Sequence, residues 1–416
     1  MKILFVGWNG WGHVNPTLSL INQLLRDNEV FYLNSSCYTD IVNAMGAKVV
    51  INKYMNLVYK FFQPDGFQLS KMSENVFLQR VSQFYCNLDY LYVLLGQVKK
   101  IVVELEPDLV MHDSCAHVVK YICNGINIPR ATISTLFAIT REMFFVEDGL
   151  FENLYNLRLS STVKEVLNKV DEMAYVSKNK NGYFYDYFDG FSSKGDLNLV
   201  FTSREFQPYT YLLDQTYKFI GNDLRYRSKR ENRLQLKVTN KKYILLSLGS
   251  CLCGVESYKK FYYEFMNYFG TYDAIFILVI GEMNFSDIGK IPHNFLVYRS
   301  VPQLSVLAQV DLFITHGGFN SISEAIINQV PMIVIPQIGD QFMNANQVKK
   351  HNMGIVNCYE NINFVELEKN MNEILNNPQY GKSTKEIAET YFATDQNDYA
   401  IKAICDYVKN EKRRRI

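Results

Sequence analysis

Short apolar runs alternate with amphipathic stretches along both halves of the chain. In the N-terminal half, residues 2–6, 30–34 and 108–113 each have the length and apolar character of a buried strand. After the first run, Asn15 precedes Pro16, which predicts a helix with Asn15 as its N-cap and Pro16 as its first residue. Strand, helix and strand in this order predict a parallel sheet with crossover helices.

The same alternation restarts in the C-terminal half and predicts a second doubly wound α/β domain. Its strand-like runs are residues 243–250, 274–281, 295–300, 311–316 and 331–336. We therefore expect an N-terminal domain (1–220), a charged linker (221–242), a C-terminal domain (243–383) and a helical segment (384–416) that packs back toward the N-terminal domain.

Two aromatic segments, residues 55–100 and 135–195, interrupt the alternation in the N-terminal half. We expect irregular insertions that lie above the strand ends and shape a pocket. Their aromatic residues either line an apolar pocket or form ordinary core. The residues concerned are Tyr59, Phe61, Phe62 and Phe67 in the first segment, and Phe137, Phe144, Phe145 and Phe151 in the second.

Composition narrows the possible partners and locations. The chain has 43 basic and 42 acidic residues, so charge gives no reason to expect nucleic-acid binding. The terminal KNEKRRRI is either a solvated helix end or a weak membrane-surface contact. We expect no signal peptide and no transmembrane segment, because the apolar runs are far shorter than the roughly 20 residues of a spanning helix. Eight cysteines without metal-ligand spacing predict free thiols and a cytoplasmic location.

The segment from His316 to Ser321 (HGGFNS) has the features of an anion-binding turn. It follows the apolar run DLFIT and precedes an apolar-periodic helix. Gly317 and Gly318 allow a bulky anion to approach the backbone, and the helix start offers N–H groups and a positive dipole end. The alternative is a tight strand-to-helix turn with a good cap.

Three further residues near this segment, Glu324, Asp340 and Gln341, also have two interpretations each. Glu324 either completes a capping box with Ser321 or accepts hydrogen bonds from both ribose hydroxyls of a nucleotide. Asp340 and Gln341 follow another predicted strand, where they either bind sugar hydroxyls or start a helix.

His13 follows the first strand in the stretch GWNGWGHVNP. An ordinary histidine pKa of roughly 6.5 suits a general base near neutrality. The local pattern alone favours a structural histidine over a catalytic one.

Three stretches resemble the donor-binding signature of glycosyltransferase family 1, the UDP-glycosyltransferase superfamily: VPQLSVL (301–307), DLFITHGGFNSISEA (311–325) and PMIVIPQIGDQFMNANQV (331–348). GHVNP (12–16) is similar to the bacterial branch that modifies macrolides and other natural products. The resemblance implies the GT-B fold, in which two Rossmann-like doubly wound domains face a central cleft.

The resemblance also implies a role for each candidate residue. His13 is then the general base, and Asp113 orients it. In the donor site, His316, Gly318, Asn320, Ser321 and Ser250 lie at the diphosphate, Val301 and Gln303 beside the nucleobase, Glu324 at the ribose, and Asp340 and Gln341 at the sugar hydroxyls. The family usually has tryptophan where this chain has Ser300, which leaves the choice between uracil and thymine open.

The reaction implied is inverting transfer of a sugar from a nucleotide diphosphate sugar, most simply a UDP-sugar, to a hydroxyl of a small, largely apolar acceptor. No DxD tripeptide occurs in the chain, so we expect neither a metal site nor a cofactor beyond the donor itself.

Other functions remain as alternatives. A nicotinamide-dependent oxidoreductase is disfavoured because Gly7, Gly10 and Gly12 have the order GxxGxG and Asn34, not an acidic residue, ends the second strand. A sugar-nucleotide isomerase of the same fold and a transferase acting on a membrane lipid stay open. A catalytically silent partner protein is disfavoured by the presence of His13 and Asp113.

Overall fold

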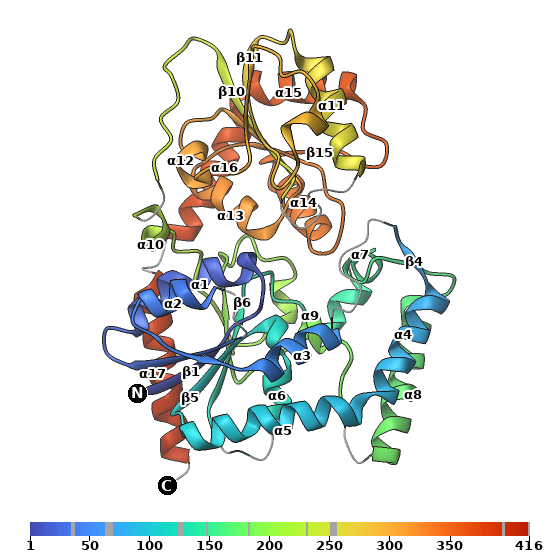
Figure 1. The fold of residues 1–416 in the computed structure, drawn as a ribbon, viewed down its shortest axis with the longest axis vertical. Coiled ribbons are helices and arrows are strands. Elements are labelled where there is room, and N and C mark those ends of the chain that lie inside the picture. The colour runs from blue at the N-terminus through green and yellow to red at the C-terminus, as the bar shows by residue number, and fades with distance from the viewer. Residues whose placement is uncertain are drawn as a thin grey trace. The chain divides into compact units, whose positions relative to one another are not determined.

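The computed structural model describes residues 1–34, 38–62, 70–123, 126, 128–146, 149–181, 184–229, 232–249, 256–392 and 396–414. The chain forms two compact units (Figure 1). Unit 1 comprises Met1–Tyr226 and Thr394–Ile416, and unit 2 comprises Arg227–Ala393.

Unit 1 is built on a seven-stranded parallel sheet in the order β3-β2-β1-β5-β6-β8-β9. The apolar runs predicted as strands are confirmed as β1, β2 and β5. The strands are β1 (Lys2–Val6), β2 (Glu29–Asn34), β3 (Lys48–Ile51), β5 (Leu109–Asp113), β6 (Arg130–Ser134), β8 (Leu197–Val200) and β9 (Tyr217–Phe219). A separate pair consists of β4 (Met72–Ser73) and β7 (Leu157–Arg158).

The helices of unit 1 connect these strands or lie outside the sheet. They are α1 (Trp11–Leu24), α2 (Thr39–Ala44), α3 (Lys53–Phe62), α4 (Glu74–Cys86), α5 (Leu88–Leu105), α6 (Val118–Cys123), α7 (Leu150–Leu154), α8 (Val163–Asn181), α9 (Asp189–Ser192) and α17 (Gln396–Arg414). Short 3-10 segments are η1 (Ser114–Ala116), η2 (Arg141–Phe145) and η3 (Thr210–Leu212).

The start of α1 corrects the prediction that Pro16 is the first helical residue. Gly10 is the N-cap, and its carbonyl accepts hydrogen bonds from the backbone N–H of His13 (2.9 Å) and Val14 (3.0 Å). Pro16 therefore lies inside the helix, although proline is most favourable in the first turn. The early start places His13 in the first turn of α1, directly after the sheet.

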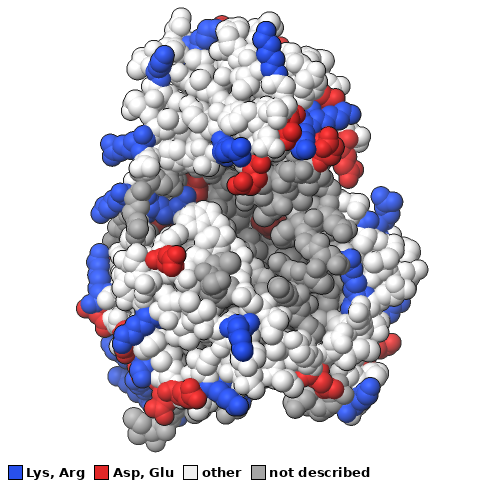
Figure 2. Space-filling model, in the orientation of Figure 1, with Lys and Arg blue, Asp and Glu red and all other residues white. Residues whose placement is uncertain are grey.

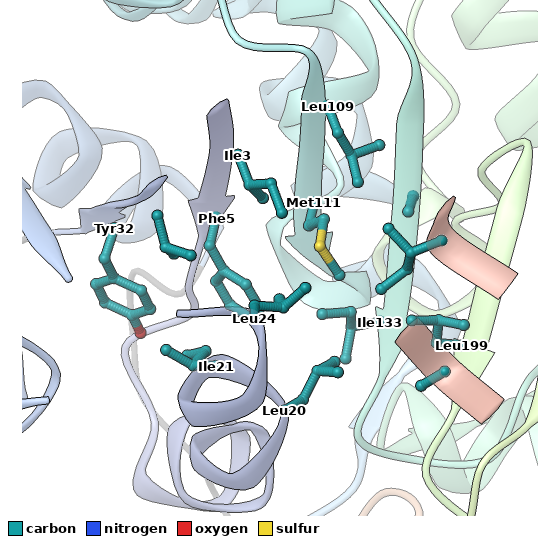
Figure 3. Packing of buried hydrophobic residues seen from close by; sticks show 14 of the residues in the cluster. Ile3, Phe5, Leu20, Ile21, Leu24, Tyr32, Leu109, Met111, Ile133 and Leu199 are labelled. Carbon is teal, nitrogen blue, oxygen red and sulfur yellow. The ribbon is translucent and has the colours of Figure 1, made fainter. Parts of the chain in front are cut away.

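The core of unit 1 lies between the sheet and helices from both ends of the chain. Ile3 and Phe5 of β1 and Met111 of β5 pack against Leu20 and Ile21 of α1 (Figure 3). The same cluster includes Ala400, Ile404 and Val408, all from α17. The C-terminal helix therefore belongs to the core of unit 1.

The two aromatic segments are largely helical, so the prediction of irregular insertions is wrong. In α4, the buried residues Phe77, Val81 and Phe84 follow the helical period. Figure 1 shows α4 and α8 running side by side.

Most of the described candidate pocket aromatics are core residues. Phe137, Phe144 and Phe151 are all buried. Phe144 and Phe151 contact each other with their ring centroids 5.3 Å apart. Phe145 is exposed. Only the backbone of Tyr59, Phe61 and Phe62 is described, within α3, and Phe67 lies outside the described residues.

Unit 2 contains a six-stranded parallel sheet in the order β12-β11-β10-β13-β14-β15, the doubly wound arrangement that the sequence predicts. The five predicted runs are strands, and a sixth, β15, was not predicted. The strands are β10 (Lys242–Ser247), β11 (Ala274–Val279), β12 (Phe295–Tyr298), β13 (Leu312–Thr315), β14 (Met332–Val334) and β15 (Gly354–Val356).

The helices of unit 2 cover this sheet. They are α11 (Glu256–Phe269), α12 (Gln303–Leu307), α13 (Phe319–Ile327), α14 (Gln341–Lys350), α15 (Phe364–Asn376) and α16 (Pro378–Phe392), with a 3-10 segment η4 (Phe285–Ile288). Phe265 and Phe269 of α11 pack on Phe276 of β11, whose ring stacks on Phe295 with centroids 4.7 Å apart. The short helix α10 (Arg225–Ser228) lies where unit 1 gives way to unit 2.

Two further observations concern possible partners. Among the described residues, no helix is long and apolar enough to cross a membrane. On the face shown in Figure 2, basic and acidic side chains are interspersed over both units.

Candidate functional site

In unit 1, three polar side chains meet at the carboxyl ends of neighbouring strands. His13 follows β1, Asp113 ends β5 and Thr135 comes directly after β6. These strands are adjacent, and the strand order reverses between β1 and β5, which is where ligands bind in open parallel sheets. The sheet therefore brings His13 and Asp113 together, as the sequence predicts.

The contacts of the imidazole fix its tautomer. His13 Nδ1 lies 3.1 Å from Asp113 Oδ2 and 3.2 Å from Oδ1. Asp113 is buried, and a carboxylate can only accept hydrogen bonds, so the Nδ1 atom carries a proton and donates it. The lone pair of a neutral His13 is then on Nε2. This arrangement suits a general base whose positive charge, once formed, is stabilised by Asp113.

Thr135 is a third member of this group that the sequence patterns did not reveal. Its Oγ1 lies 2.9 Å from His13 Nδ1 and donates to Asp113 Oδ2 at 3.2 Å. The side chain is buried, so it holds both partners in place. The strand before it, β6, was not among the predicted runs, so no sequence signal marked Thr135.

The other two histidines near the dyad are buried structural residues. His112 bonds the backbone carbonyl of Asp113 and the hydroxyl of Thr132 through its two ring nitrogens. Burial lowers the pKa of His112 to about 3 and that of His117 to about 4. Both are therefore neutral near pH 7 and are unsuited to the proton transfer assigned to His13.

In unit 2, the predicted anion-binding turn connects β13 to α13. The N-cap of α13 is Gly318, which has no side chain to satisfy the first N–H groups of the helix. Gly317 has φ of +87°, a conformation that favours glycine. The positive dipole end of α13 therefore begins at this turn.

The ring of His316 fits against two glycines in this turn. A Cβ atom would come within 2.6 Å of His316 Nε2 at Gly249 and within 2.5 Å at Gly318. Burial lowers the pKa of His316 to about 4, against an opposing contribution from the backbone of Ser247. His316 is therefore a neutral hydrogen-bonding group, and Gly318 contributes space for it.

Glu324 accepts hydrogen bonds from two side chains and is not part of a capping box. Its Oε1 accepts from Arg227 Nη1 at 2.6 Å, and its Oε2 accepts from Gln303 Nε2 at 2.8 Å. The capping-box alternative is wrong because Gly318, not Ser321, is the N-cap of α13. The buried carboxylate is held by a permanent positive charge on one side and an amide on the other.

Arg227 is the second residue that the sequence patterns did not reveal. It lies in the stretch interpreted as a charged linker, and its side chain is only 10% exposed. Nothing in the local pattern distinguishes it from the neighbouring basic residues, because its partner is 97 positions away.

The remaining donor candidates lie in α12, in the segment before it and in α13. Gln303 also approaches Ser321 Oγ at 3.4 Å, so these residues and Glu324 form one cluster. Val301 is partly exposed in the segment before α12, next to the exposed Ser300. Asn320 is the second residue of α13.

The turn before α14 is tied to the anion-binding turn. Asn344 Nδ2 donates to the carbonyl of Gly317 at 2.8 Å and to Asp340 Oδ2 at 3.0 Å. Gln341 Oε1 accepts from the backbone N–H of Gln337 and Ile338 at 2.9 and 3.3 Å. The side-chain oxygen of Gln341 is thus engaged by the backbone, and the side-chain NH2 group is the part suited to a ligand. Ser250 lies outside the described residues.

Comparison with known proteins connects both units to sugar transfer. Residues 243–391 match the family model described as UDP-glucoronosyl and UDP-glucosyl transferase. The chain is 28% identical to the uncharacterized UDP-glucosyltransferase YojK of Bacillus subtilis (strain 168), covering 99% of this chain and 98% of that one. It is 27% identical to the oleandomycin glycosyltransferase of Streptomyces antibioticus, covering 81% of this chain and 75% of that one.

A solved structure extends the likeness to the whole fold. The glycotransferase of kitacinnamycin superposes with a TM-score of 0.75 at 23% identity, covering 98% of this chain and 100% of that one. This likeness confirms the expected GT-B fold.

Proposed function

We propose that this chain transfers a sugar from a nucleotide diphosphate sugar to a hydroxyl group of a small acceptor, with inversion at the anomeric carbon and without a metal ion. The match of residues 243–391 to the UDP-glucoronosyl and UDP-glucosyl transferase model and the similarity to a UDP-glucosyltransferase over 99% of the chain support this proposal. The observation that carries this proposal is the pairing of His13 Nδ1 with Asp113, which leaves Nε2 to act as a base.

The chemical step uses this base. His13 Nε2 takes the proton of the acceptor hydroxyl, and the oxygen attacks the anomeric carbon of an α-linked donor. The bond between that carbon and the diphosphate oxygen breaks, so the product is β-linked. Asp113 stabilises the imidazolium that forms, and a base of this kind typically contributes about 10²–10⁴ in rate.

Unit 2 supplies the donor site in this proposal. Glu324 accepts hydrogen bonds from the ribose hydroxyls, and Arg227 and Gln303 hold its carboxylate in position. The diphosphate lies at the start of α13, beside His316 of the turn and Asn320 and Ser321 of the helix. The helix dipole contributes roughly 0.3–2 kcal/mol to binding an anion there, and charge-assisted hydrogen bonds add to it.

The nucleobase and the transferred sugar lie on either side of the diphosphate in this proposal. We assign the nucleobase to Val301 and Gln303, and the sugar hydroxyls to Asp340 and the amide of Gln341. We take a UDP-sugar as the donor, and because Ser300 offers no ring for stacking, its thymidine counterpart is the alternative.

The acceptor class is proposed from the relatives. Oleandomycin glycosyltransferase, which is similar over 81% of this chain, acts on a natural product by its name. The buried Phe137, Phe144 and Phe151 support the core of unit 1 and give no separate argument for an apolar pocket. The described cysteines are free thiols, which fits a reducing compartment such as the cytoplasm.

A donor and acceptor panel tests this function. Release of the nucleoside diphosphate is measured with UDP- and dTDP-sugars, each paired with phenolic and macrocyclic alcohols or with oligosaccharides and peptides. We expect turnover with the alcohols, and the His13→Ala variant should lack it under the same conditions. Turnover only with oligosaccharides or peptides would overturn the acceptor class. No release with any donor would overturn the proposed reaction.

A further inference from the structure

A cysteine lies beside the His13–Asp113 dyad and completes a set of three possible metal ligands. One ligand atom each from His13, Asp113 and Cys115 lies within 4.8 Å of the others. Asp113 is the N-cap of η1, and its Oδ1 accepts from the backbone N–H of Cys115 at 2.8 Å. The cap fixes Cys115 next to the carboxylate, so their proximity follows from the local fold.

Two of the three residues are accessible from solvent. Cys115 is a free thiol of intermediate burial, and the His13 side chain is 19% exposed. The Asp113 side chain is 2% exposed and is the buried, fixed member of the group.

The donor set of nitrogen, oxygen and sulfur selects for a particular kind of cation. Imidazole and thiolate favour zinc, whereas magnesium and calcium prefer oxygen donors. Tetrahedral zinc with normal bond lengths holds its donor atoms roughly 3.3–3.6 Å apart. His13 Nδ1 and Asp113 Oδ2 are 3.1 Å apart, close to this spacing, and the three ligand atoms lie within 4.8 Å of one another, so the set must contract to hold an ion.

We propose that His13, Asp113 and Cys115 form an inhibitory site for a thiophilic divalent cation, with zinc as the preferred ion. The site takes three protein ligands and leaves the fourth position of the ion open to water. It is a site of inhibition because it uses the same side chains that deprotonate the acceptor. The inhibition rests on the proposed function, but the binding does not.

The proton balance explains the inhibition. The ion takes the place of the proton on His13 Nδ1, and the single N–H of the neutral imidazole then resides on Nε2. The Cys115 thiol loses its proton to solvent and binds as the thiolate. With its lone pair engaged by the N–H bond, Nε2 no longer accepts the proton of the acceptor hydroxyl. Thr135 loses its contact with Nδ1 and keeps its bond to Asp113 Oδ2.

Cobalt and zinc binding to the full chain tests the site directly. Co²⁺ should bind with a thiolate-to-cobalt charge-transfer band that Zn²⁺ displaces. The band should be absent in Cys115→Ser and present in Cys86→Ser, which removes an exposed thiol of the same unit. Zinc affinity, measured by competition, should fall by more than about tenfold in Cys115→Ser. An unchanged band in Cys115→Ser would overturn the proposal.

A second measurement needs no variant. Iodoacetamide should alkylate Cys115 in the wild-type protein, and zinc should slow this reaction at Cys115 but not at Cys86, as followed by peptide mass. Equal rates at Cys115 with and without zinc would contradict the site.

Inhibition is measured separately, with each variant compared with its own rate without zinc. The zinc concentration for half-inhibition should rise at least about tenfold in Cys115→Ser and stay constant in Cys86→Ser. Zinc bound at Cys115 without loss of turnover would overturn the inhibitory role. A protein that transfers no sugar even without zinc would contradict the proposed function, while the cobalt and alkylation results would still decide the metal site.

Discussion

Each unit has a buried carboxylate at the centre of its own group of candidate residues, but the two carboxylates have chemically different partners. In unit 1, Asp113 faces the imidazole of His13, a group that can both accept and donate a proton. In unit 2, Glu324 faces the guanidinium of Arg227, which keeps its charge at any pH that a folded protein tolerates. The partner therefore decides what the carboxylate does: the first pair can move a proton, and the second can only hold a shape and a charge.

The largest expected effect comes from removing the base in unit 1. His13→Ala should lower turnover by about 10²–10⁴, because the acceptor hydroxyl loses its proton acceptor. UDP affinity should stay unchanged, since the donor residues belong to unit 2. Turnover assays together with calorimetry of UDP binding measure both quantities.

His316→Ala provides the complementary variant, and His293→Ala, an exposed position in unit 2, serves as the control. His316→Ala should weaken UDP binding as well as turnover. The assignment of the two units would be reversed if His13→Ala abolished UDP binding while His316→Ala left it intact.

The second prediction concerns the permanent ion pair of unit 2. Arg227→Met should leave Glu324 buried without its positive partner and lower the free energy of unfolding of unit 2 by about 3–5 kcal/mol. UDP binding should weaken in parallel because the carboxylate loses its fixed orientation. Denaturant unfolding and UDP calorimetry measure the two effects.

A double substitution separates the pair from a general loss of packing. Arg227→Met combined with Glu324→Met removes both charges, so much of the unfolding free energy should return while UDP affinity stays low. If the double variant is as unstable as the sum of the two single variants, the two residues do not act as a pair.

Much of this contrast could be predicted from the sequence, because the parallel-sheet pattern places residues that follow strands at one edge. His13 and Asp113 were identified by that reasoning together with the family resemblance. The start of α1 was not, since Gly10 caps the helix with its backbone alone. Helices α4 and α8 were missed although their buried residues, such as Val166, Val170 and Ala174 of α8, follow the helical spacing.

Residues that act through distant partners were beyond reach of the sequence. Arg227 and Glu324 are 97 positions apart, and only the fold joins them. Thr135 contacts His13 across 122 positions. A single sequence holds no record of such contacts, so the residues that position the key carboxylates emerge only from the structure.

The third prediction sharpens the donor side of the comparison. Ser300→Trp should tighten UDP binding, because a ring at this position can stack on the base, and stacking on an aromatic side chain is worth about 1–3 kcal/mol. This free energy corresponds to a rise in UDP affinity of roughly 5–150-fold. Calorimetry with UDP and dTDP measures it.

Ser300→Leu is the matched control, since it adds apolar surface without a ring. The leucine variant should gain less than the tryptophan variant. Equal affinities for the wild type and Ser300→Trp would mean that the base does not lie against residue 300, and the assignment of Val301 to the base would fail with it.

The smallest expected effect is that of removing metal ions. In the proposed reaction, the leaving diphosphate is stabilised by the start of α13 and by His316, a neutral side chain whose pKa is lowered by burial to about 4. Neither group needs a cation to act. Turnover should therefore survive EDTA, and it should rise slightly if trace zinc occupied His13 and Cys115 beforehand.

Adding metals back distinguishes the two sides of the molecule. Mg²⁺ and Mn²⁺ should leave the rate unchanged after EDTA treatment. These ions prefer oxygen ligands, so they bind poorly to the site with a thiolate in unit 1, and the proposed diphosphate site in unit 2 does not require a cation. Zn²⁺ should lower the rate, and fresh EDTA should restore it. A rate that collapses with EDTA and returns with Mg²⁺ or Mn²⁺ would show that unit 2 cannot stabilise the diphosphate by its helix and side chains alone. The contrast would then change, since the donor side would depend on a cation that the base side does not use.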